Sequence, residues 1–146
     1  MNANSKSMPT FPEGEKGYLT VRVSTARGAI PLEGATVNVR GNREDDSGVI
    51  YSLLSDRDGK TPRVELNAPS SQNSASPGEA LPYATYNIDV FKEGYSPVFF
   101  HSVPIFPGIT SVQPAVMIPA VSEAINIDES YRATPDSKDA EKEELV

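Results

Sequence analysis

Two closely spaced aspartates are the most direct indication of chemistry in this sequence. Asp56 and Asp58 precede Gly59, as in the first half of a calcium loop, and Ca²⁺ prefers carboxylate oxygens. An EF-hand loop also needs Asp or Asn, Gly and Glu at its fifth, sixth and twelfth positions. Those positions hold Lys60, Thr61 and Asn67. We therefore predict a polar turn without metal, in which Asp56 bonds its own backbone and Gly59 takes a positive φ. Weak calcium binding shared with residues 43–47 is the alternative.

Histidine and cysteine, two residue types on which many hydrolases depend, are nearly absent. His101 is the only histidine, the chain has no cysteine, and no G-x-S-x-G nucleophile motif occurs. His101 lies in the apolar, strand-like run VFFHSVPIF, where a single histidine more often has a structural role than a catalytic one. The spacing of Ser102, His101 and Asp89 does not support a catalytic triad. The sequence predicts a chain that is not an enzyme, with no catalytic residue, metal or cofactor.

Composition and charge limit the class of partner. The chain has 146 residues and a net charge of −7, without a basic stripe that would suit a phosphate backbone, so we expect no nucleic-acid partner. No apolar run reaches the ~18 residues of a membrane span. The first residues lack the apolar segment of a secretory signal peptide. Localisation stays open between a cytoplasmic or spore-associated protein, one secreted by another route, and one whose signal has been removed.

Seven segments have the pattern of β-strands. Residues 18–24 and 35–40 alternate strictly, so that Leu19, Val21 and Val23 share one face. Pro114 places the last strand at a sheet edge or a bulge. The sequence predicts an all-β, seven-stranded antiparallel Greek-key β-sandwich. The other predicted strands cover residues 49–55, 61–66, 83–91, 96–106 and 109–119.

The sandwich is expected to cover residues 17–119. Residues 1–16 are small and polar and predict a flexible N-terminal arm, and residues 120–146 predict an acidic, mostly disordered tail. The Ser- and Pro-rich connection at residues 67–82 is long, and such loops are often functional. Tyr83 beside it and Tyr95 in a later turn are candidates for an interaction surface. The alternative is that the aromatic residues belong to the core and the loop is slack.

Three segments together resemble a known family. Residues 31–37 (PLEGATV), 55–60 (SDRDGK) and 86–95 (YNIDVFKEGY) follow the scheme of the carboxypeptidase regulatory-like domain. That family has a transthyretin-like, or prealbumin-like, β-sandwich, and the resemblance extends over roughly residues 17–119. It implies that the motif residues are structural turn positions, namely Pro31, Gly34, Asp56, Asp58, Gly59 and Gly94.

The resemblance also leads to an expected function. Residues 81–119 are similar to the variant of this domain in spore-forming Gram-positive anaerobes, where it accompanies peptidoglycan-binding and spore cortex-lytic modules. This implies a non-catalytic interaction or accessory module of a bacterial cell-envelope, spore or extracellular assembly, with a protein or cell-wall polymer as partner. One alternative is a structural subunit that forms a homo-oligomer through edge strands or the N-terminal arm. A second is a carbohydrate- or peptidoglycan-binding module.

Overall fold

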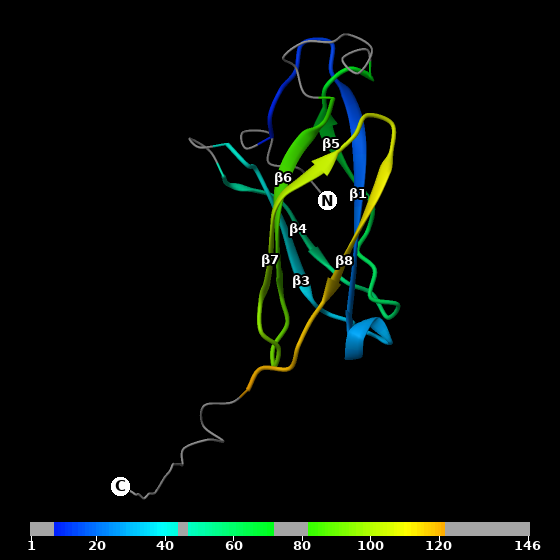
Figure 1. Ribbon diagram of the computed structural model, residues 1–146, viewed down its shortest axis with the longest axis vertical. Coiled ribbons are helices and arrows are strands. Elements are labelled where there is room, and N and C mark those ends of the chain that lie inside the picture. The colour runs from blue at the N-terminus through cyan, green and yellow to red at the C-terminus, as the bar shows by residue number, and fades with distance from the viewer. Residues whose placement is uncertain (1–7, 44–46, 72–81, 122–146) are drawn as a thin grey trace, which may run out of the picture.

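The computed structural model describes residues 8–43, 47–71 and 82–121, and these form two packed β-sheets (Figure 1). The all-β, two-sheet architecture is confirmed. The strand count is wrong, because the described residues form eight strands, and one of them has only two residues and therefore no alternation to detect. The strands are β1 (Glu15–Thr25), β2 (Ile30–Pro31), β3 (Thr36–Arg40), β4 (Val49–Leu54), β5 (Val64–Ala68), β6 (Ala84–Phe91), β7 (Val98–Ile105) and β8 (Thr110–Val116), with a 3₁₀ turn η1 (Ala26–Gly28) after β1.

Sheet A is built around β1, which runs along most of the molecule (Figure 1). One edge of β1 pairs with β5 near its start and with β2 near its end, both antiparallel. The other edge pairs with β8 in parallel, so the prediction of an entirely antiparallel sandwich is wrong. Met117 donates its backbone N–H to the carbonyl of Ser24 in β1. The backbone groups of every second residue of β8 therefore point toward β1, and the backbone nitrogen of Pro114 points toward the open edge of the sheet. There its missing N–H removes no ladder bond.

Sheet B has the order β4-β3-β6-β7, and every neighbouring pair is antiparallel. The end of the β8 segment joins this sheet at the turn between β6 and β7. Ser96 donates its N–H to the carbonyl of Ile118, and Ala120 donates to that of Gly94. The last described residues therefore fasten one end of sheet A to sheet B.

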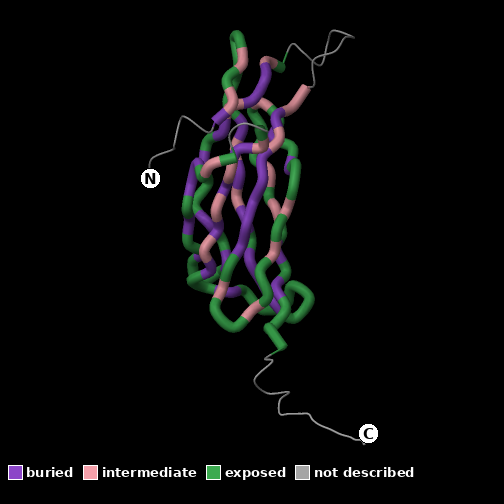
Figure 2. Tube along the Cα trace, turned by 90° about the vertical axis from the view of Figure 1, so that its left-hand side faces the viewer, coloured by how far each residue is buried: buried purple, intermediate pink, exposed green. Residues whose placement is uncertain are grey.

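The inward-facing residues of both sheets form one apolar core (Figure 2). Two tyrosines of sheet B cross it: Tyr51 donates its hydroxyl to the carbonyl of Glu65 at 2.9 Å, and Tyr86 donates to that of Asn67 at 2.5 Å. Both acceptors lie in β5 of sheet A. Burial raises the pKa of each phenol, which keeps the hydroxyl a donor. The largest fully buried side chains are Tyr86, Leu19, Leu53, Leu66, Ile88, Ile105 and Met117.

Residues 8–16 pack onto the sandwich, which corrects the prediction of a flexible arm over residues 1–16. Met8 is buried in the core, and Asn67 donates its side-chain amide to the carbonyl of Pro9 at 2.8 Å. Strand β1 begins at Glu15, before the predicted boundary at residue 17. Residues 1–7, most of the predicted 67–82 loop and residues 122–146 lie outside the described part of the chain. No helix within the described part is long and apolar enough to cross a membrane.

Candidate interaction surface on sheet B

The outer face of sheet B carries a group of polar contacts and two exposed aromatic rings. The strict alternation of β3 and β6 buries Val37, Val39, Ile88 and Val90 and turns their neighbours outward. One part of this face, the polar cluster, consists of Arg40, Asn42, Thr85, Asn87, Asp89 and Ser102. The other part, the aromatic end, consists of Leu54, Phe91 and Phe99.

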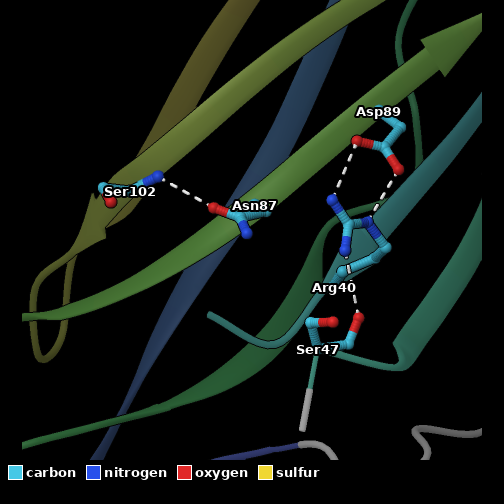
Figure 3. Close-up of polar contacts among 5 residues, drawn as sticks. All are labelled: Arg40, Ser47, Asn87, Asp89 and Ser102. Atoms are coloured by element: carbon cyan, nitrogen blue, oxygen red, sulfur yellow. Dashed lines mark hydrogen bonds and ion pairs between the residues drawn. The ribbon is translucent and has the colours of Figure 1, made fainter. Parts of the chain in front are cut away.

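An ion pair between β3 and β6 organises the polar cluster (Figure 3). Arg40 Nε donates to Asp89 Oδ2 at 2.7 Å, and its Nη2 donates to Oδ1 at 3.4 Å. Arg40 Nη1 also donates to the carbonyl of Ser47 at 3.1 Å. The two side chains are only 24% and 11% exposed, so solvent screens this pair less than a surface pair. The arrangement holds both charges in fixed positions on the sheet.

A β-bulge in β7 forms the other half of the polar cluster. The register between β6 and β7 shifts between Tyr86 and Ile88, and Ser102 has a φ of 59°. Asn87 Oδ1 accepts the backbone N–H of Ser102 at 2.9 Å, which gives the bulged strand a partner where the ladder is interrupted (Figure 3). Asn42 Nδ2 donates to Ser102 Oγ at 3.1 Å and to Thr85 Oγ1 at 2.8 Å.

The bulge explains where His101 lies. Simple alternation along residues 98–106 predicts that His101 shares a face with Phe99 and Val103, unless it lies at a strand end. In the structure His101 and Phe99 are exposed, whereas Val103 is buried in the core. His101 and Ser102 together lie opposite the single residue Asn87, so β7 contains one extra residue here. The side chains that follow in β7 therefore point to the opposite face from the one that simple alternation predicts. His101 does not form a catalytic triad with Asp89 and Ser102, because Asp89 accepts from Arg40 and Ser102 Oγ accepts from Asn42.

The aromatic end is an exposed apolar patch. Phe91 and Phe99 are 39% and 51% exposed, and their rings meet edge to face with centroids 5.9 Å apart. Leu54 is 63% exposed and belongs to the neighbouring edge strand, opposite Thr36 of β3. A hollow of about 300 Å³ adjoins the patch. Its lining residues are Gly34, Thr36, Phe91, Lys92, Glu93, Tyr95 and Pro97.

The two predicted surface tyrosines do not form one surface. Tyr83 precedes β6 and packs against Phe106 with ring centroids 5.3 Å apart. Tyr95 follows β6, packs partly against the core and lines the hollow beside the aromatic end. The eight residues of β6 separate them. Sequence reasoning missed Phe91 and Phe99, although the outward phase of Phe91 after the buried Val90 was available as a signal.

The predicted turn residues lie at the ends and connections of strands. Asp56 Oδ1 accepts the N–H groups of Asp58 and Lys60, each at 2.9 Å, and Gly59 has a φ of 79°. Gly34 and Gly94 also have positive φ, and Pro31 lies in β2 opposite Ser24. Oδ1 of Asp56 therefore stabilises the backbone of the turn. Over the described ranges, no group of three or more His, Asp or Glu side chains is placed to hold one metal ion.

Comparisons with known proteins give similarity in structure but not in sequence. No protein-family model matches the chain, and no curated protein matches it. Catechol 1,2-dioxygenase from Pseudomonas arvilla C-1 aligns at 13% identity with a TM-score of 0.52, over 81% of this chain and 57% of that one. The mercury-inhibited catechol 1,2-dioxygenase from Acinetobacter sp. ADP1 aligns at 13% identity with a TM-score of 0.50, over 85% of this chain and 59% of that one. The Bacillus anthracis TIE protein aligns at 16% identity with a TM-score of 0.45, over 73% of this chain and 17% of that one. The chain thus spans less than two thirds of each.

The two dioxygenase similarities overturn the prediction that the chain is not an enzyme. The dioxygenases are enzymes, and they share the β-rich fold that the sequence argument treated as belonging to an accessory domain. The absence of hydrolase motifs is too narrow a basis for excluding catalysis. At 13% identity the similarity shows the fold alone, so it assigns no reaction and no catalytic residue to this chain.

Proposed function

We propose that the chain is an interaction module that binds a cell-wall polymer or a protein through the outer face of sheet B. The observation that carries this proposal is the exposed Phe91–Phe99 pair beside the hollow lined by Tyr95. Grouped exposed apolar side chains mark interaction sites more often than single ones do. Aromatic rings are also enriched at interfaces, because they bury a large area at a small cost in side-chain entropy.

The polar cluster supports the same proposal, because it gives the surface a fixed shape. Arg40 and Asp89 join β3 to β6, and Asn87 holds the bulged strand β7. Asp89 lies directly opposite Phe99 in the β6–β7 register. A partner would therefore meet a preorganised surface with ordered polar groups beside apolar rings, which lowers the entropic cost of binding. A carbohydrate polymer has both apolar faces and hydroxyl groups and suits such a surface.

The experiment is co-sedimentation with purified peptidoglycan sacculi and spore coats. Phe91→Ser with Phe99→Ser should abolish retention, whereas Val112→Ser with Val116→Ser, which removes two exposed valines of sheet A, should retain the binding of the parent. Equal retention of both double variants would contradict the proposed surface. No retention of the parent above an unrelated sandwich domain would contradict a cell-wall polymer as partner and leave only a protein.

We also propose membership of the carboxypeptidase regulatory-like family, with its Greek-key connectivity, in a bacterial cell-envelope, spore or extracellular assembly. Its support is the sequence resemblance together with the positions of the three segments. Residues 31–37 connect β2 to β3, residues 55–60 form the turn between β4 and β5, and residues 86–95 cover most of β6 and the following turn. Each motif thus falls on an element of the kind that the resemblance requires.

A second candidate is a structural subunit that self-associates through β8. Within the described residues, strand β8 pairs only with β1, and Val112 and Val116 on it are 53% and 44% exposed. An open edge with exposed branched residues is a template for strand addition. Light scattering coupled to size-exclusion chromatography tests this candidate. A monomer whose mass is independent of concentration contradicts it, and a dimer lost on Val112→Lys supports it.

A further inference from the structure

A pair of adjacent cations lies on the outer face of sheet A, away from the surface proposed above. Arg22 of β1 and Lys60 of the β4–β5 turn face each other in an antiparallel bridge, and both are exposed. Neither side chain forms an ion pair with any residue that the structure describes. Like charges directly opposite each other destabilise a sheet. A carboxylate placed against both would remove this repulsion.

The cations border a hollow with one apolar wall. The hollow has a volume of about 400 Å³ and is lined by Thr20, Arg22, Lys60 and Val112. Arg22 also lines a neighbouring hollow of about 270 Å³, whose lining among the described residues includes the acidic Asp58 and the apolar Val116. Asp58 does not form an ion pair with Arg22. The face therefore offers two cations, a hydroxyl group and exposed valines, which suit a segment that carries both carboxylates and branched apolar side chains.

The chain itself contains such a segment. Residues 122–146 hold eight acidic and three basic residues, and Ile125 and Ile127 immediately precede Asp128 and Glu129. The described chain ends at Val121, beside the β6–β7 turn, where Ala120 donates its N–H to the carbonyl of Gly94. Before that point, β8 lies beside β1 and places Pro114 opposite Arg22. Six residues lead from Pro114 to Ala120, and eight more lead to Asp128. At about 3.3 Å per extended residue, the segment is long enough to return to Arg22.

We propose that residues 122–131 bind the outer face of sheet A of the same chain, with Asp128 and Glu129 against Arg22 and Lys60. The isoleucines then cover the exposed valines of β8. Tethering favours this contact, because a short linker gives an effective concentration in the millimolar range. The segment would cover Val112 and Val116, whose exposure favours self-association through β8, so it acts as an internal competitor of a second chain.

Paramagnetic broadening in the full-length chain tests this proposal. Because the chain has no cysteine, Ser130→Cys provides one site for a nitroxide label. We expect strong broadening of the amide signals of Thr20, Arg22 and Val112 and none at Asn38 on sheet B. Arg22→Glu, and independently Lys60→Glu, should reduce the broadening about threefold or more, on the scale of a lost exposed ion pair.

Lys92→Glu is the matched control, since it changes the net charge equally on sheet B and should leave the broadening unchanged. Salt at 1 M, where the Debye length is about 3 Å, should act like Arg22→Glu. Equal broadening of both sheets, or an equal effect of Arg22→Glu and Lys92→Glu, overturns the proposal. Broadening that appears only when labelled chains are mixed with separate ¹⁵N-enriched chains also overturns it, because the segment would then bind a second chain.

Discussion

The ion pair between Arg40 and Asp89 should contribute measurably to stability, and a double-mutant cycle can measure how much. The variants are Arg40→Gln, Asp89→Asn and the double substitution. Exposed pairs are worth about 0.2–1 kcal/mol, whereas breaking a buried pair costs about 3–5 kcal/mol. The side chains are 24% and 11% exposed, between these limits. We therefore expect Asp89→Asn to cost about 1.5–3 kcal/mol and the coupling energy to be about 1–2 kcal/mol.

Urea unfolding monitored by circular dichroism measures each free energy of unfolding, and an unchanged m-value shows that the two-state comparison holds. Lys92→Gln is the control, because the described residues give Lys92 no ion pair; it should cost less than about 0.5 kcal/mol. In 1 M salt the coupling should largely persist, since the pair is mostly shielded from solvent. A coupling below about 0.3 kcal/mol, or one that salt removes, would refute the view that this pair holds the outer face of sheet B rigid.

Three further predictions concern the fold around the proposed surfaces. Tyr86→Phe should cost about 1–3 kcal/mol in urea unfolding, because the carbonyl of Asn67 loses its buried donor; a loss below about 0.5 kcal/mol contradicts this. Gly59→Ala should lower the melting temperature more than Gly94→Ala does: both glycines have positive φ, but only at Gly59 does a Cβ meet backbone, 2.3 Å from the oxygen of Val23. Hydrogen bonds from Ser71 lower the pKa of Glu15 below its ordinary 4.5. The ionised carboxylate therefore stabilises the folded state above pH 4.5, and this stabilisation is lost as the pH falls through the lowered pKa. Glu15→Gln should flatten the fall in unfolding free energy in that acid range, and an unchanged pH profile would show that the contact with Ser71 does not matter.

The sequence alone predicts the elements whose conformation depends on residues close together in the chain. The alternation of Leu19, Val21 and Val23 predicts a half-buried strand, because side chains on a strand point to opposite faces in turn. The turn at Asp56 could also be predicted, because the Asp56 carboxylate accepts hydrogen bonds from backbone amides only two and four residues later. The fold class and most strand positions could therefore be predicted without knowing how the strands pair.

The tertiary structure decided what depends on partners distant in the chain. Parallel pairing of β8 with β1 joins residues about 90 positions apart, and alternation is the same in either direction of pairing. The bulge at Ser102 needs Asn87 of β6 to accept its N–H, so a single-strand pattern predicted the wrong face for Val103. Phe91 and Phe99 become one exposed patch only through the β6–β7 register. Residue types determined the strands, whereas strand register determined which side chains meet, because register brings together groups that no local pattern relates.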